Sequence, residues 1–119
     1  MPVARIRGAN INYEVIGDSG PWVALTPGGR RDLSGVRYLA DRVAAHGFRV
    51  LLHDRRNCGA SDVILEGEDP EYVIWADDLH DLLGQLGATP AFVGGTSAGC
   101  RLALLTYLRH PEIVRGLLL

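Results

Sequence analysis

A glycine-flanked serine is the strongest chemical signal in this sequence. The segment Gly95-Thr96-Ser97-Ala98-Gly99 has the form G-x-S-x-G, with an apolar run before it and a helix-like pattern after it. On a sharp strand-to-helix turn a serine hydroxyl is exposed, and glycines prevent a collision of side chains across the turn. The N–H groups that open the helix favour a developing oxyanion. Ser97 is therefore a candidate nucleophile for acyl transfer, and the alternative is a tight glycine turn without chemistry.

A nucleophilic serine needs a general base within hydrogen-bond reach, and four histidines are the candidates. His110 would end the helix that begins near Ser97, about 20 Å away at about 1.5 Å per residue. His46 would end another helix at the far edge of the sheet, and His80 would lie in mid-helix on a polar face. His53 would close a strand at the correct edge, but about 10 Å to the side after two strand steps. A direct Ser97–His53 dyad is the less favoured alternative to a structural role for His53.

In a catalytic triad an acidic residue orients the histidine base. Because no histidine is expected within reach of Ser97, none is left for the acidic candidates to orient, which are Asp54, Asp62, Asp77 and Asp78.

Length, charge and cysteine spacing exclude several classes of protein. A chain of 119 residues suits one domain, residues 1–119, and the net charge of −2 argues against a nucleic-acid partner. No apolar run reaches the roughly 18 residues of a membrane span, and no secretory signal is visible. Cys58 and Cys100 form neither a C-x-x-C pair nor a zinc-ligand spacing. We expect a cytoplasmic protein with reduced thiols, no membrane partner, no metal and no cofactor.

Hydrophobic patterning predicts a strand hairpin followed by alternating strands and helices. "VARIRG" and "NINYEVIG" alternate as antiparallel strands with a turn at Gly8-Ala9. Continuous apolar runs predict buried strands at "WVALT", "FRVLLHD", "AFVGG" and "IVRGLLL". Helices are predicted over 35–45, 70–86 and 98–109, with Ser34 and Asp69 as N-caps and with Gly47 and Gly87 as stops.

This order of elements predicts an α/β fold: a mostly parallel sheet with helices on both faces and an N-terminal antiparallel hairpin. "WVALT" is expected between "FRVLLH" and "AFVGG", all parallel, with "NINYEVI" outside and antiparallel. Ligands of such sheets bind at the carboxyl ends of the strands. Three loops should meet there: "PGGRRDLSG", "RRNCGASD" and the turn at Ser97.

Together with the G-x-S-x-G turn, two further segments make the chain resemble the N-terminal half of an α/β-hydrolase. "HDRRNCGASD" is similar to the DxRGxGxSD segment after the family's fourth strand, notably in cofactor-free haloperoxidases and related esterases. "LTPGGR" takes the place of the family's oxyanion loop. The resemblance implies a three-layer αβα fold and a small-molecule acyl substrate. The bond cleaved would be an ester, a thioester or an activated C–C bond, through an acyl-enzyme on Ser97.

The resemblance also implies the oxyanion donors. These would be the N–H of Ala98 and that of Gly29, or of its neighbour Arg30, although Pro27 stands where the loop's histidine usually is. Dehalogenases and epoxide hydrolases of this fold carry aspartate at the elbow, so Ser97 argues against those activities. The Arg30 side chain is a further candidate, for attracting a carboxylate-bearing substrate; the alternative is a solvated arginine on the rim.

In the family, the triad acid and histidine follow the sixth strand, so both are expected beyond Leu119, as is the cap. A second chain or a C-terminal fragment would complete the fold, and a homo-oligomer remains open. The leading interpretation is a serine hydrolase of which this chain is the N-terminal portion, nearly inactive alone. The alternative is a non-catalytic, truncated hydrolase-like binding or assembly module that pairs "GLLL" with a partner.

Overall fold

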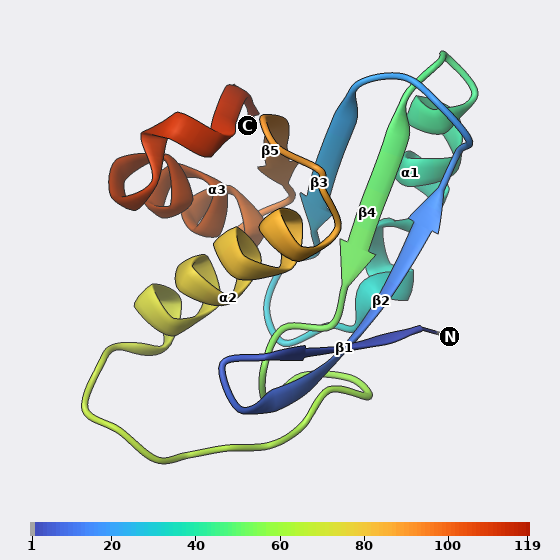
Figure 1. The fold of residues 1–119 in the computed structure, drawn as a ribbon. Coiled ribbons are helices and arrows are strands. Elements are labelled where there is room, and N and C mark those ends of the chain that lie inside the picture. Colours follow the sequence, from blue (N-terminus) through green and yellow to red (C-terminus); the bar gives the residue numbers. More distant parts are fainter. Residues whose placement is uncertain (1) are drawn as a thin grey trace.

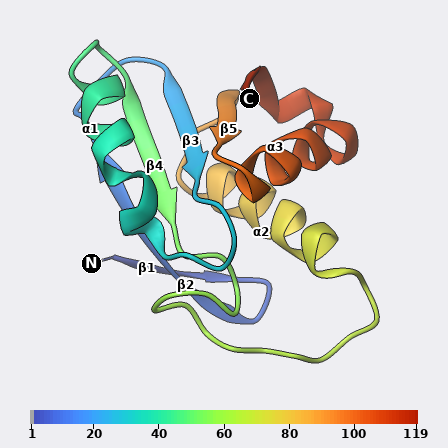
Figure 2. The same ribbon diagram turned by 180° about the vertical axis from the view of Figure 1, so that it is seen from behind.

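The computed structural model describes residues 2–119 and contains a six-stranded sheet with helices on both faces (Figure 1, Figure 2). The strands are β1 (Val3–Ile6), β2 (Ala9–Ile16), β3 (Trp22–Thr26), β4 (Arg49–His53), β5 (Ala91–Gly95) and β6 (Val114–Leu118). The helices are α1 (Arg37–Ala44), α2 (Glu71–Gln85) and α3 (Ala98–Arg109), with 3-10 turns η1 (Leu33–Val36) and η2 (Pro111–Ile113). No helix within residues 2–119 combines the length and the apolar character needed to cross a bilayer.

The strand order is β1-β2-β4-β3-β5-β6, which confirms the predicted topology. β3 lies between β4 and β5 and is parallel to both, with Val23 paired to Val50 on one side and to Phe92 on the other. β2 is antiparallel to β4, and β1 is antiparallel to β2. Because β3, β4 and β5 run in the same direction, the loops after them emerge at one edge of the sheet.

Helices cover both faces of the central strands, which explains why the sequences of these strands are continuous apolar runs. On one face Leu51 packs in a cluster with Leu79 of α2 and Ala103 of α3. On the other face Leu52 packs with Ala40 of α1. Figures 1 and 2 show α2 and α3 side by side on one side of the sheet and α1 on the opposite side. Burying a leucine side chain in this way stabilises the fold by about 1.5–3 kcal/mol.

The hairpin turn and the start of α1 differ from the prediction. Arg7 and Gly8 form the turn, with φ of 47° and 86°, so Gly8-Ala9 was one residue too late. Positive φ at two successive residues gives the turn the twist that antiparallel strands need. Ser34 is not the N-cap: the Asp32 carboxylate accepts the Ser34 N–H and caps η1 instead. The segment therefore begins as a 3-10 turn, and α1 itself begins at Arg37.

The start of α2 also differs from the prediction, whereas its end is confirmed. Pro70 occupies the N-cap position and no side chain caps the helix there, so the predicted cap at Asp69 was wrong. Proline has a fixed φ suited to a helix entry, and α2 then begins at Glu71. Gly87 follows the C-cap with φ of 66°, as expected for a glycine that stops a helix.

A buried ion pair joins the loop after β4 to α2 and to the hairpin. Arg56 donates to both carboxylate oxygens of Asp78, each at 2.9 Å, and Arg56 Nη2 also donates to the carbonyl oxygens of Ile6 and Arg7 at 3.2 Å. Burial raises the pKa of Asp78, although the hydrogen bonds and charge of Arg56 act in the opposite direction. The Trp75 indole N–H donates to the Arg56 carbonyl at 2.8 Å. The loop is therefore fixed from three directions.

We expect Arg56→Ala to lower the free energy of unfolding by about 3 kcal/mol, because the buried Asp78 would lose both hydrogen bonds from Arg56 and keep only Arg7, at 3.2 Å, as a cationic partner. Arg5→Ala is the matched control. Its ion pair with Asp62 is long, at 3.8 Å, and exposed. Such a pair contributes about 0–1 kcal/mol. Urea unfolding of both variants measures the difference, and equal small losses would contradict a structural role for the buried pair.

Candidate active site

Ser97 lies on a sharp turn between β5 and α3. Its φ is 52° and its ψ is −116°, a conformation that residues other than glycine rarely adopt. The residue is exposed, and its side chain makes no capping hydrogen bond to α3. These are the positive φ and the solvent-facing hydroxyl that the G-x-S-x-G pattern predicts. A strained backbone at an exposed hydroxyl is typical of a nucleophile that must reach substrate.

The two glycines of the motif permit close backbone contacts. A Cβ at Gly95 would lie 2.9 Å from the Cα of Gly99, which is the predicted collision across the turn. A second reason was not predicted: a Cβ at Gly95 or at Gly99 would lie 2.4 or 2.2 Å from the Thr26 carbonyl oxygen. The turn therefore packs against the end of β3 at a distance that only glycine allows.

The loop after β3 reaches the serine directly. A Cβ at Gly28 would lie 3.0 Å from Ser97 Cβ and 3.6 Å from Ser97 Oγ. The loop bends sharply here, because the Arg31 N–H donates to the Gly28 carbonyl at 3.3 Å and Gly29 has φ of 55°. The N–H groups of Gly29 and Arg30 belong to this bend, beside the nucleophile candidate. The loop therefore lies where the second oxyanion donor is expected.

The first oxyanion donor is expected at the start of α3. Ala98 is the first residue of this helix, and an N–H at that position has no acceptor within the helix. The next two N–H groups are already used: Gly99 donates to Thr96 at 2.8 Å and Cys100 donates to Ser97 at 2.9 Å. The positive end of the helix dipole also lies here and favours negative charge.

Asp54 holds the loop that carries Pro27 in place of a histidine. Its carboxylate accepts the Leu33 N–H at 2.7 Å, the Asn12 side-chain amide at 3.0 Å and the Ala60 N–H at 2.9 Å. The carboxylate therefore connects the loop after β3 with the loop after β4 and with β2. Sequence analysis assigned Asp54 no role. The sequence feature that could have indicated a role is the position of Asp54 directly after a buried strand.

The sequence matches a family model described as alpha/beta hydrolase fold over residues 21–119. The matched segment contains β3 to β6 and all three loops described above. This chain belongs to the α/β hydrolase fold family.

Relatives of known or assigned class agree with this family. The uncharacterized hydrolase YraK of Bacillus subtilis is 36% identical over 110 residues, which are 92% of this chain and 40% of YraK. A solved esterase from Exiguobacterium antarcticum has a TM-score of 0.85 and 30% identity, over 97% of this chain and 42% of that one. An epoxide hydrolase from Vigna radiata has a TM-score of 0.88 at 18% identity, over 98% and 36%, a likeness in fold alone. This chain thus spans between 36% and 42% of the length of these proteins.

The Arg30 side chain already has partners within the chain. Its guanidinium donates to both carboxylate oxygens of Glu71 at the start of α2, one of them at 3.1 Å, and lies 5.7 Å from the centroid of the Trp75 ring. A guanidinium whose charge is balanced by Glu71 attracts a substrate carboxylate less strongly. The geometry therefore favours the interpretation of Arg30 as an arginine on the rim of the site over a role in attracting a substrate carboxylate. Sequence spacing gave no sign of the Arg30–Glu71 pair.

His53 is buried and is not hydrogen-bonded to Ser97. It is 2% exposed, and neither ring nitrogen has a hydrogen-bond partner within residues 2–119. Burial lowers the pKa of His53 to about 4, with a further contribution from the charge of Arg55 and an opposing one from Asp54. β3 lies between β4 and β5, so His53 is two strands away from the elbow. The structure thus argues against the dyad, and within residues 2–119 the ring makes no hydrogen bond that would hold the neighbouring loops, which is the structural role predicted for it.

The other three histidines lie away from Ser97. His46 Nδ1 lies 2.8 Å from the Arg42 carbonyl oxygen at the end of α1. His80 and His110 stack on each other with ring centroids 4.1 Å apart. The expectation that Asp77 has no histidine was wrong, because Asp77 Oδ1 lies 2.7 Å from His110 Nε2. This His–Asp pair is at the far end of α3, whose 12 residues span about 18 Å.

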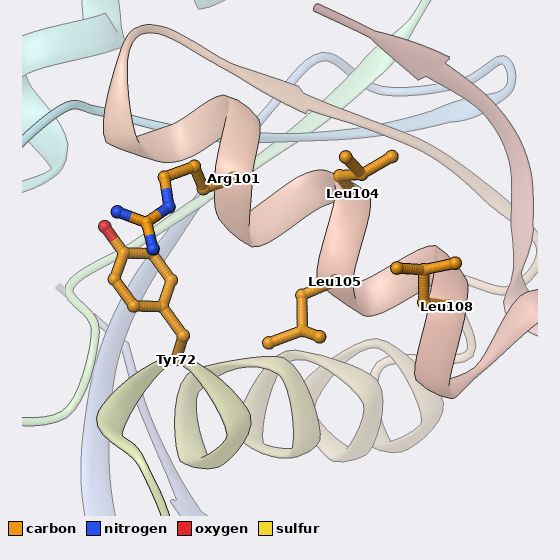
Figure 3. Close-up of a pocket in the computed structure, with 5 residues that line it drawn as sticks. All are labelled: Tyr72, Arg101, Leu104, Leu105 and Leu108. Carbon is orange, nitrogen blue, oxygen red and sulfur yellow. The ribbon is translucent and has the colours of Figure 1, made fainter.

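The groove between α2 and α3 is apolar and has no acyl-transfer chemistry of its own. Figure 3 shows its five lining residues: Tyr72, Arg101, Leu104, Leu105 and Leu108. The Arg101 guanidinium lies over the Tyr72 ring, 4.6 Å from its centroid. Leu104 is 44% exposed and Leu108 is 67% exposed, so α3 presents apolar surface to solvent. None of these side chains is a nucleophile or a base suited to activate one.

We expect His53 to make the stability of the chain depend on pH. The pKa of about 4 in the folded state lies below the ordinary value of 6.5. The unfolded chain therefore takes up the proton first, and stability falls as the pH drops from 6.5 to 4. The loss should reach about 2–3 kcal/mol at pH 4.5. Urea unfolding at pH 7 and pH 4.5 measures this loss. His53→Phe should remove most of this slope and His46→Ala should keep it, whereas parallel slopes in all three proteins would refute the assignment.

Proposed function

We propose that this chain carries the nucleophile and the oxyanion hole of a serine hydrolase. Its substrate would be a small acyl compound with an ester, a thioester or an activated C–C bond. One observation carries the proposal: Ser97 is an exposed serine at positive φ, in contact with the Gly28 bend and directly before the free N-terminus of α3. The solved esterase at 30% identity supports an acyl-transfer class, and the uncharacterized hydrolase YraK at 36% identity supports a hydrolase.

In the proposed reaction, Ser97 Oγ attacks the carbonyl carbon while a histidine base takes the hydroxyl proton. The carbonyl oxygen becomes negative and accepts hydrogen bonds from the N–H groups of Ala98 and Gly29. Collapse of this intermediate breaks the bond to the leaving group, which receives the proton from the histidine, and leaves the acyl group on Ser97. Water, activated by the same base, then releases the acid.

The base is proposed to come from polypeptide beyond residue 119 or from a second chain. The histidines within residues 2–119 are buried, engaged or far from Ser97, as described above. Apolar surface at the end of the sheet supports a completing polypeptide: Leu118 is 45% exposed and Leu119 is 70% exposed, and β6 is the edge strand. An apolar edge strand next to exposed leucines of α3 is a surface that further chain would cover.

The same edge strand supports a second candidate function. A module without catalysis would pair β6 with a strand of a partner. The turn at Ser97 would then have no catalytic role. This candidate differs from the first in one measurable respect. It allows no turnover even when the chain is extended to a complete gene product.

We expect the 119-residue chain to be nearly inert towards a p-nitrophenyl ester, because an unassisted serine hydroxyl is a weak nucleophile at neutral pH. The samples are the chain, its Ser97→Ala variant and the chain extended to a complete gene product. Only the extended chain should turn over, and Ser97→Ala in it should reduce kcat by several orders of magnitude.

Two results would change the proposal. An inactive extended chain would favour the binding module. Strong turnover by the short chain, abolished by both Ser97→Ala and His53→Ala, would establish a dyad within these residues and overturn an external base.

A further inference from the structure

We propose that His80, His110 and Glu112 bind a divalent zinc-like cation at the end of α3 remote from Ser97. The three side chains each present one ligand atom, and these atoms all lie within 4.8 Å of one another. The Glu112 Oε1 atom is 3.8 Å from His80 Nε2 and 4.0 Å from His110 Nδ1. The residues come from α2, from the end of α3 and from η2, so the site joins three elements. The cluster is separate from the proposed acyl-transfer site.

Each histidine is oriented by its own carboxylate. His80 Nδ1 lies 2.8 Å from Asp81 Oδ1, and His110 Nε2 lies 2.7 Å from Asp77 Oδ1. In a neutral imidazole, the nitrogen next to a carboxylate carries the proton and the other nitrogen keeps its lone pair. The free lone pairs are then those of His80 Nε2 and His110 Nδ1, the two atoms nearest Glu112. A carboxylate behind each ligating histidine is the usual outer arrangement of protein metal sites.

The carboxylates around the two rings give the cluster an excess of negative charge. Three of them, from Asp77, Asp81 and Glu112, lie beside His80 and His110. Arg109 donates two hydrogen bonds of 2.9 Å to Asp77, which places that carboxylate behind His110. The cluster therefore has the charge that attracts a divalent cation.

The donor set selects the class of ion. Two imidazoles and one carboxylate suit zinc and its transition-metal neighbours, whereas calcium and magnesium prefer oxygen ligands throughout. Bonds of about 2.0–2.1 Å in a tetrahedral site put ligand atoms about 3.4 Å apart, so atoms that now lie within 4.8 Å of one another must close by up to about 1.4 Å. The two stacked rings must also turn away from parallel, because each lone pair lies in the plane of its ring. Glu112 is 64% exposed and free to move, and water would fill the fourth position. Sequence analysis expected no metal, from the spacing of Cys58 and Cys100, and 30 positions separate the two histidines, so no local ligand motif pointed to them.

Calorimetric titration of the untagged, chelator-stripped protein with zinc chloride tests the site. We expect one equivalent of zinc per chain. Glu112→Gln should weaken binding at least tenfold, and His80→Ala should abolish it. Asp77→Asn, which disturbs only the outer carboxylate, should weaken binding about 10–100-fold. The control His46→Ala removes an exposed histidine from α1 and should bind like the wild type.

Imidazole nitrogen chemical shifts provide an independent measurement, since zinc should shift His80 Nε2 and His110 Nδ1 and leave the His46 nitrogens unchanged. Ser97→Ala should bind zinc normally, which separates this site from the proposed hydrolase function. Failure of the wild type to bind zinc at millimolar concentration would overturn the proposal. So would undiminished binding by Glu112→Gln and His80→Ala, or binding that disappears in Cys100→Ser, because the half-buried thiol would then be the ligand.

Discussion

The carbonyl oxygen of Thr26 determines where the turn with Ser97 lies. It occupies space that a Cβ at Gly95 or Gly99 would need, at 2.4 and 2.2 Å. Side chains at either position would push the start of α3 away from β3, and the serine would move with it. Gly28 lies two residues beyond Thr26, and a Cβ there would lie 3.0 Å from Ser97 Cβ, a tighter contact than usual. Backbone contacts that admit only glycine at Gly95 and Gly99 therefore position the proposed nucleophile, and the loop proposed to supply the oxyanion donor packs closely beside it.

The loops above this contact depend on buried carboxylates. The Asp54 carboxylate accepts hydrogen bonds from Leu33, Asn12 and Ala60. Because Asp54 belongs to the loop after β4, these bonds tie the loop after β3 to that neighbouring loop. A buried carboxylate is costly unless such partners are present. Gly59 is part of the same arrangement, since a Cβ there would lie 2.4 Å from the Asp54 carboxyl carbon. This network fixes the loop after β3, which is proposed to supply the second oxyanion donor.

The parts that the sequence predicted well are those that depend on local patterns. Continuous apolar runs predicted the buried strands, the hairpin followed by strand–helix units predicted how the central strands are ordered, and the glycines around Ser97 predicted its positive φ. The parts that were missed depend on contacts between distant positions. Arg30 meets Glu71, and His110 meets Asp77, across 41 and 33 positions. Hydrophobic periodicity does not predict such pairs, because it does not show which charged residues on loops and helix ends lie close together in the fold.

The two ends of α3 differ in their electrostatics, and the two proposed sites follow that difference. The N-terminal end presents the N–H of Ala98 and a partial positive charge beside Ser97, which suits an oxyanion. The C-terminal end presents carbonyl groups and a partial negative charge at His110, its C-cap, which suits a cation. About 18 Å of helix separates them, beyond the screening distance of about 8–10 Å near physiological salt. A cation at His110 would therefore act on the site at Ser97 only through the position of α3, by fixing its far end to α2.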